Sequence, residues 1–140
     1  MYRDQFTICN QLSELSHIQH RLENFLAEHC DHLGVVDEMM LIAEELIVNT
    51  ITHGYPDQQQ HLIEIKFHID GQQNFAMEFC DDARPFDPLS AEQPELGLCS
   101  EEVAIGGLGI PLVKALSDQQ HYQHRQGKNV LRILKSLTNN

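Results

Sequence analysis

The chain has 140 residues, and its 41% apolar content is enough material for one domain with its own core. Its 9 lysines and arginines stand against 21 aspartates and glutamates, a net charge of −12, which argues against nucleic acid and anionic membranes as partners. An anionic ligand would therefore have to be held by local devices such as helix N-termini, backbone amides or a metal ion.

No apolar run approaches membrane-spanning length, and the N-terminus lacks a signal-peptide pattern, so we expect a cytoplasmic protein. The cysteines match no zinc or redox spacing, and we expect reduced thiols rather than a disulfide framework. They are Cys9, Cys30, Cys80 and Cys99. Among the nine histidines we single out only His53, and we expect the others to be solvated surface groups.

The first part of the chain predicts one strand and two helices. The segment 2–10 contains a short Phe-Thr-Ile-Cys run and is a candidate edge strand. Apolar residues then recur at three- and four-residue steps from Leu12, which predicts an amphipathic helix ending between residues 29 and 34, with Ser13 as its N-cap. Residues 35–53 predict a second, more apolar helix. Its main apolar face is expected to comprise Val36, Met40, Ala43, Ile47 and Ile51, widened by Met39 and Leu46.

The second part predicts two hairpins separated by a loop and a short helix. The segment 61–70 alternates between apolar and polar residues, and a two-residue turn at Asp70-Gly71 leads into a return strand. The long segment 89–105 is typical of a lid, and a short helix follows it. The last two strands are expected at 121–125 and 129–137, joined at Gly127-Lys128.

This order of elements predicts a single α+β domain over residues 1–140. We expect a two-layer α/β sandwich in which a mixed, mostly antiparallel sheet is covered on one face by helices.

Polar residues interrupt the apolar run of the second predicted helix. Glu45, Asn49 and His53 are spaced four residues apart and share one helix face. An amide oxygen suits a hard cation such as Mg²⁺, and a carboxylate one turn away can accept a proton from a nucleophile. The alternative is an ordinary polar face on a partly exposed helix, and this motif alone does not exclude it.

Two aspartates follow the strand that ends near Cys80. Asp81 can accept a hydrogen bond from an exocyclic amine such as that of adenine, and the residues through Phe86 let the backbone turn beside a ligand. A plain surface turn that carries two aspartates explains the same residues equally well.

A glycine cluster, Gly106-Gly107-Leu108-Gly109, precedes the third predicted helix. Glycines let backbone amides approach phosphate closely, and a helix N-terminus favours negative charge. The cluster therefore offers a way to hold phosphate without a basic patch, although glycines also serve loop flexibility. It is not a Rossmann fingerprint, because no strand-glycine-helix unit with a downstream acid surrounds it.

In this order and spacing, the three motifs resemble the N, G1 and G2 boxes of the ATP-binding superfamily that includes DNA gyrase, the heat-shock-90 chaperone, histidine kinases and a mismatch-repair ATPase. They resemble in particular those of the small bacterial anti-sigma-factor serine/threonine kinases. The matching segments are 45–54, 81–88 and 106–113, and the tail from Tyr122 to Lys135 is also similar. One position departs from the pattern: Ala83 replaces the middle glycine of G1, which we expect to weaken nucleotide binding or leave it unchanged.

The resemblance implies a role for each motif residue. Glu45 would be the general base that activates a serine hydroxyl of a partner, Asn49 a ligand of Mg²⁺, and Asp81 the acceptor for the adenine amino group. The backbone amides of Gly107 and Gly109 would contact the phosphates, beneath the lid. The other nucleotide-binding positions would be His53, Ala83, Arg84, Phe86, Gly106, Leu108 and Ile110.

The resemblance also implies ATP and Mg²⁺ as cofactors and an anti-sigma-factor antagonist as the protein substrate. It further implies a sigma factor as a second partner and allows a homodimer. We therefore predict an ATP- and Mg²⁺-dependent protein serine/threonine kinase that regulates transcription. A function of a different class keeps the nucleotide but drops catalysis: a switch that sequesters a partner according to nucleotide state. The ATPase part of a histidine kinase is disfavoured, because the chain has no room for a dimerisation helix pair with a phospho-accepting histidine.

Overall fold

The computed structural model describes residues 1–29, 33–90 and 109–138. In chain order the elements are β1 (Tyr2–Cys9), a 3₁₀ helix (Leu12–Glu14), α1 (Leu15–His29), α2 (Leu33–His53), β2 (Leu62–Ile69), β3 (Asn74–Asp81), a second 3₁₀ helix (Pro88–Ser90), α4 (Gly109–Leu116), β4 (Gln119–Arg125) and β5 (Lys128–Ser136).

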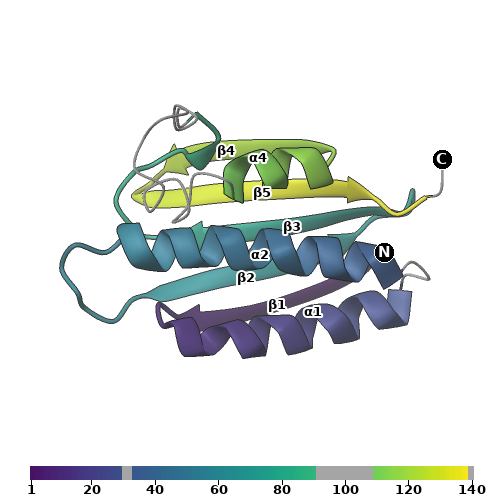
Figure 1. Ribbon diagram of the computed structural model, residues 1–140, viewed down its shortest axis with the longest axis horizontal. Helices are drawn as coiled ribbons and strands as arrows, with labels where there is room; N and C mark the ends of the chain where they lie inside the picture. Colours follow the sequence, from purple (N-terminus) through teal and green to yellow (C-terminus); the bar gives the residue numbers. More distant parts are fainter. Residues whose placement is uncertain (30–32, 91–108, 139–140) are drawn as a thin grey trace, which may run out of the picture.

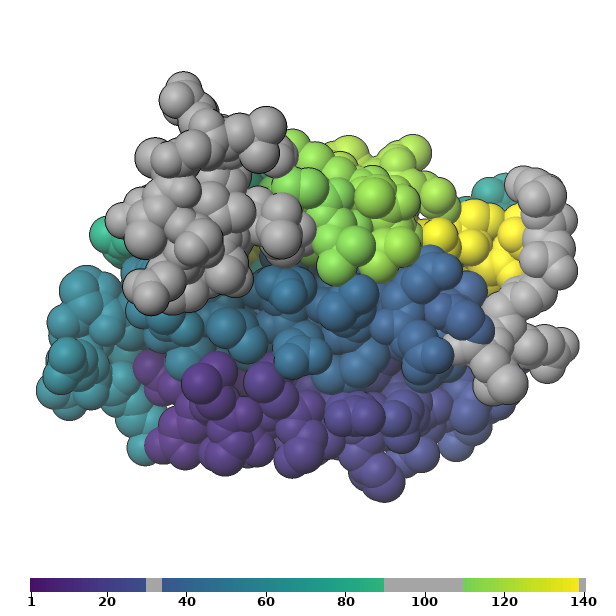
Figure 2. Space-filling model, viewed as in Figure 1, coloured from purple at the N-terminus to yellow at the C-terminus, as the bar shows by residue number. Residues whose placement is uncertain are grey.

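The five described strands form one sheet in the order β1-β2-β3-β5-β4, with every neighbouring pair antiparallel. The helices α1, α2 and α4 cover one face of this sheet (Figure 1). The space-filling view from the same side shows α2 seated between α1 and α4 (Figure 2). Because α1 and α2 run in opposite directions, the chain re-enters the sheet antiparallel to β1. The predicted α+β two-layer sandwich is confirmed, and β1 is an edge strand as expected, but the described strands are all antiparallel rather than mixed.

The hydrophobic core lies between the sheet and the helices. Alternate residues of β2 face the helices and are almost wholly buried, as the predicted alternation requires. These residues are Ile63, Ile65, Phe67 and Ile69. The helices complete the core with Ile18, Leu22, Phe25 and Leu26 from α1 and with Met39, Ile42, Ala43, Leu46 and Ile47 from α2.

The buried face of α2 includes the predicted Met39, Ala43, Leu46 and Ile47, but its centre is shifted from the predicted one. Met39 and Ile42 are fully buried, whereas Val36, Met40 and Ile51 are only half-buried. Since the sheet, α1 and α4 all contact α2, its apolar arc is wide, and spacing alone does not locate the centre of that arc.

The cap predicted for the first helix is wrong. Ser13 lies inside the 3₁₀ helix, whose N-cap position is Gln11 and has no side-chain cap hydrogen bond. The carboxylate of Glu14 instead accepts a hydrogen bond from the backbone N–H of Cys9 at 3.0 Å. The helical geometry begins one short turn before α1, so the cap position lies upstream of the predicted one.

The turn between β2 and β3 also differs from the prediction. Residues 70–73 separate the two strands, rather than a two-residue Asp70-Gly71 turn. The carboxylate of Asp70 accepts the backbone N–H groups of Gln72 at 2.8 Å and Asn74 at 2.9 Å, which stabilises the longer loop. The last hairpin does have a two-residue turn, at Gln126 and Gly127, with φ values of 55° and 77°. It lies one residue before the predicted position.

The predictions on thiols and membrane segments can be compared only within the described residues. Cys9 and Cys80 are free thiols, while Cys30 and Cys99 lie outside the described ranges. No helix in the described ranges has the length and apolar character needed to cross a membrane. Of the predicted lid at 89–105, only Leu89 and Ser90 are described.

Candidate functional site

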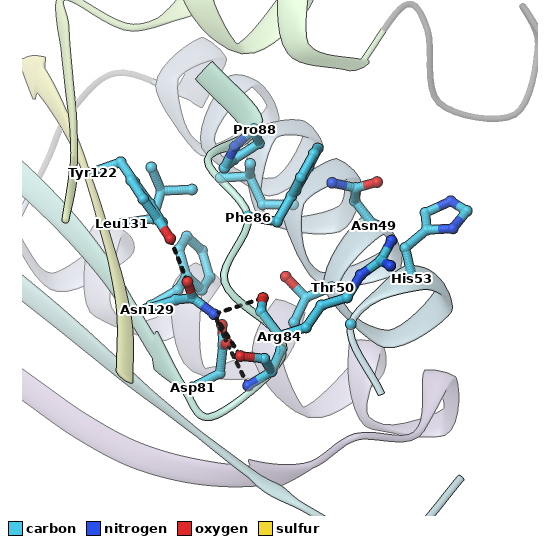
Figure 3. A pocket seen from close by; sticks show the side chains of 14 residues that line it. Asn49, Thr50, His53, Asp81, Arg84, Phe86, Pro88, Tyr122, Asn129 and Leu131 are labelled. Carbon is cyan, nitrogen blue, oxygen red and sulfur yellow. Dashed lines mark hydrogen bonds between the residues drawn. The ribbon is translucent and has the colours of Figure 1, made fainter. Parts of the chain in front are cut away.

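A cavity of about 120 Å³ opens where β3 ends, between the sheet and the C-terminal half of α2 (Figure 3). Its walls come from α2, from β3 and the turn after it, and from β4 and β5. The lining residues are Leu46, Asn49, Thr50, His53, Gly54, Phe79, Asp81, Ala83, Arg84, Phe86, Pro88, Tyr122, Asn129 and Leu131. Two of the three predicted motifs, those of α2 and of the turn after β3, therefore meet in one site.

Asp81 is the last residue of β3 and lies among the lining residues with only 6% of its surface exposed. Its Oδ1 accepts hydrogen bonds from the side-chain amide of Asn129 and from the backbone N–H of Ala83, both at 3.0 Å. Burial raises the pKa of the Asp81 carboxyl, and these two hydrogen bonds oppose the rise. A buried carboxylate of this kind is suited to a ligand that brings its own hydrogen-bond donor.

Asn129 on β5 stands directly opposite Asp81 in the β3–β5 ladder. Its Nδ2 lies 3.0 Å from the carbonyl oxygen of Ala83 and 3.2 Å from that of Arg84. Its Oδ1 accepts a hydrogen bond from the hydroxyl of Tyr122 on β4. Neither Tyr122 nor Asn129 was predicted as a site residue, although both lie in the tail that resembles the kinase family.

The turn after β3 packs against the end of α2. The backbone N–H of Gly54 donates to Thr50 at 2.8 Å, and the backbone N–H of Arg84 donates to the carbonyl oxygen of Gly54 at 2.9 Å. Ala83, the residue that departs from the G1 pattern, is 6% exposed and lines the cavity beside Gly54. Ala83 therefore lies where the turn after β3 contacts the end of α2.

Only part of the polar stripe predicted on α2 reaches the cavity. Asn49 and His53 line it, together with Thr50, whereas Glu45 is half-buried and does not line it. Four residues of helix advance about 40° beyond a full turn, so Glu45 and His53 differ in direction by about 80°. This difference in direction places the side chain of Glu45 to one side of the cavity. Thr50 was missed because the stripe was extended in steps of four, which pass over it.

The other predicted site residues divide into three groups. Arg84 and Phe86 line the cavity, as Figure 3 shows, and both are exposed, Phe86 with 45% of its surface accessible. Gly109 begins α4, and Ile110 is half-buried against the core without lining the cavity. Gly106, Gly107 and Leu108 lie outside the described residues.

Beside the cavity, the loop after α2 is tied to the turn after β3. The imidazole of His61 contacts the Asp82 carboxylate through Nδ1 at 3.1 Å and the Asp57 carboxylate through Nε2 at 2.8 Å. These hydrogen bonds, first that of Asp57 and then that of Asp82, raise the pKa of His61. His61 also stacks on Tyr55, with ring centroids 4.5 Å apart. The prediction that His61 is a solvated surface group was wrong, because Asp57, Asp82 and Tyr55 surround it only once the loop has folded back.

Comparisons with known proteins identify the family of the chain. A profile of the histidine kinase-like ATPase domain matches residues 8–135. The chain is 24% identical over 100 residues to the serine-protein kinase RsbW of Listeria innocua. That match covers 69% of this chain and 63% of RsbW, so the chain spans a little under two thirds of its relative's length.

Solved structures show the same fold. The whole chain superposes on 34% of the RsbU and RsbW domains of Rv1364c from Mycobacterium tuberculosis, with a TM-score of 0.67 and 15% identity. Over 89% of its length it superposes on 64% of the histidine kinase domain of Erythrobacter litoralis EL346 blue-light activated histidine kinase, with a TM-score of 0.57 and 14% identity. The profile match spans Asn49, Asp81 and Asn129 of the cavity. The chain belongs to the histidine kinase-like ATPase domain family.

Proposed function

We propose that this chain is an ATP- and Mg²⁺-dependent protein serine/threonine kinase of the anti-sigma-factor type. The observation that carries the proposal is the buried carboxylate of Asp81 in the same cavity as the amide of Asn49 on α2. Membership of the ATPase family and the likeness to a protein named a serine-protein kinase support it. Its protein substrate would be an anti-sigma-factor antagonist, and a sigma factor would be a second partner in the cytoplasm.

The inner part of the cavity suits an aminated base. Leu46, Phe79 and Leu131 give it apolar walls, against which a flat heterocycle loses little on desolvation. Asp81 would accept the hydrogen bond of the exocyclic amine. The turn that carries Ala83 and Arg84 would contact the base from the other side.

The wall formed by α2 suits a cation held mainly by phosphate. In the described ranges, no group of three or more histidine, cysteine or carboxylate side chains could hold a metal ion. Mg²⁺ binds oxygen ligands, keeps several waters and is commonly held by few protein groups plus substrate phosphates. Asn49 would supply one amide oxygen, and bound Mg²⁺ would neutralise and orient the phosphates during transfer.

Glu45 would accept the proton of the partner's serine hydroxyl. It lies one helical turn from Asn49 and outside the cavity lining, so a partner could reach it without entering the base pocket. The position of Glu45 outside the cavity also favours a second candidate function, because the cavity could bind a nucleotide without this carboxylate. In that case the chain would be a nucleotide-dependent switch that sequesters a partner without phosphorylating it.

Phosphate transfer separates the two functions. The protein is mixed with radiolabelled ATP, Mg²⁺ and an antagonist-like protein encoded beside its gene, and label on serine or threonine is measured. We expect transfer to the antagonist, and much less with Asp81→Asn when ATP is limiting, because that variant binds ATP more weakly. ATP binding without transfer to any such partner would contradict the kinase proposal and favour the switch.

A further inference from the structure

Asp81 belongs to a network of hydrogen bonds that also includes Asn129 and Tyr122, two residues without a role in the function proposed above. Asn129 presents its amide nitrogen to three oxygen atoms, one each of Asp81, Ala83 and Arg84, at 3.0 to 3.2 Å. An amide nitrogen has two protons, so one of them is shared. The opposite amide orientation would place an oxygen against three oxygens. The side chain of Asn129 therefore has one favourable orientation.

Tyr122 fixes that orientation from the other end. Its hydroxyl donates to Oδ1 of Asn129, as the dashed lines in Figure 3 trace. Burial raises the pKa of Tyr122, and the nearby backbone N–H of Phe86 opposes the rise. Asn129 on β5 thus holds the turn at Asp81, Ala83 and Arg84, and Tyr122 on β4 holds Asn129.

The consequence for Asp81 is an asymmetric carboxylate. Both hydrogen bonds that Asp81 accepts from the described residues end on Oδ1. A carboxylate whose Oδ1 is fixed by two donors has its rotation fixed as well, and Oδ2 remains to accept from a ligand.

We infer that Tyr122 and Asn129 are a positioning pair that holds Asp81 Oδ2 toward the exocyclic amine of the base. This inference rests on the proposed nucleotide site and adds two residues that act through the acceptor, Asn129 by its hydrogen bond to Asp81 and Tyr122 by its hydrogen bond to Asn129. Their effect is therefore on selectivity for the amine.

The test compares two ligands that differ only at the base. Dissociation constants are measured, with Mg²⁺, for ATP and for purine riboside triphosphate, which carries hydrogen in place of the amine. The parent should prefer ATP by about tenfold or more, since the amine bonds to a charged acceptor. Asn129→Leu should reduce this preference to about twofold or less, and Tyr122→Phe, which keeps the ring, should reduce it by several fold.

A second measurement does not need the nucleotide. The carboxyl of Asp81 is titrated by carbon NMR, and Asn129→Leu should titrate at a higher pH than the parent, because it loses a donor to the ionised form. The matched control is Asn74→Leu, which removes another asparagine–aspartate contact, to Asp70 at 3.2 Å, far from the cavity. It should leave the ligand preference and the Asp81 titration unchanged.

The outcomes are separable. A folded Asn129→Leu protein with the parent's preference for ATP overturns the inference. If Asn129→Leu does not fold, Tyr122→Phe decides, and an unchanged preference in that variant overturns the inference as well. A parent that binds ATP and purine riboside triphosphate equally also contradicts it, while leaving a nucleotide site in place. A parent that binds neither ligand contradicts the proposed function itself.

Discussion

Gly54 and Ala83 are packed so closely that only one of them can carry a side chain without displacing the other. A Cβ added at Gly54 would lie 2.7 Å from the Cβ of Ala83 and 2.5 Å from the carbonyl oxygen of Thr50. Ala83 stands where the G1 pattern has glycine, and the residue that faces it, Gly54, is itself a glycine. The seam between α2 and the turn after β3 is therefore a matched pair, and the methyl group of Ala83 fills space that Gly54 leaves.

Replacing Gly54 by alanine should destabilise the protein by about 1–3 kcal/mol, because the added methyl overpacks this seam. Chemical denaturation measures the loss. Ala83→Gly in the same chain should restore part of it, since it removes one of the two close contacts. The control is Gly34→Ala in the first turn of α2, where an added Cβ meets nothing within 4 Å. That change should stabilise by about 0.5–1 kcal/mol. Equal losses at 34 and 54 would contradict the packing argument.

Asp81→Asn should have opposite effects on the stability of the fold and on the affinity for ATP. Burial raises the pKa of Asp81, so its ionised form is less favourable in the folded than in the unfolded protein. The amide can keep the two hydrogen bonds on one oxygen without the cost of a buried charge. We expect a free energy of unfolding equal to or above the parent's and an ATP affinity lowered by about tenfold or more. Asp37→Asn, on the exposed side of α2, should change neither.

The raised pKa of Asp81 also predicts how ATP binding depends on pH. Protonation removes the charge that strengthens the hydrogen bond Asp81 accepts and turns one of its oxygens into a donor, so ATP affinity should fall as the pH drops through the raised pKa of Asp81. The fall should begin above the ordinary aspartate pKa of about 3.9. Calorimetric titration across the acid range checks it, and the residual affinity of Asp81→Asn should lack this fall. An affinity that stays constant down to about pH 4 would show that Asp81 is not the acceptor.

The sequence predicted the buried faces that follow a clear local period, misplaced a helix cap and a turn, and missed the contacts that depend on strand register. The alternation of β2 and the amphipathic period of α1 specify their buried faces, because each face is set by residues two to four positions apart. The polar stripe on α2 and Asp81 were found in the same way. The pairing of Asn129 with Asp81 joins positions 48 residues apart, and no local pattern specifies it. It becomes visible only when β5 is aligned with β3.

His61 should make a pH-dependent contribution to stability. Its pKa is raised in the folded protein, first by the hydrogen bond to Asp57 and then by that to Asp82. A raised pKa means that the stabilisation is complete below the unfolded value of about 6.5 and is lost as the pH rises through the folded value. His61→Gln should therefore destabilise more at about pH 6 than at about pH 9. His20→Gln, on the exposed side of α1, should show no such difference in denaturation experiments.

Glu45 gives the sharpest distinction between kinase and switch. It does not line the cavity, so Glu45→Gln should leave the dissociation constant for ATP within about twofold of the parent's, as expected for a surface change away from a site. A general base contributes about 10²- to 10⁴-fold, so phosphate transfer to the antagonist should fall by at least the lower of these factors. The neighbouring Glu44→Gln is the matched control, because Glu44 is exposed on the same helix and carries the same charge. Transfer at the parent's rate in both variants would remove Glu45 from the mechanism, whereas a loss of ATP affinity in Glu45→Gln would assign it to nucleotide binding instead.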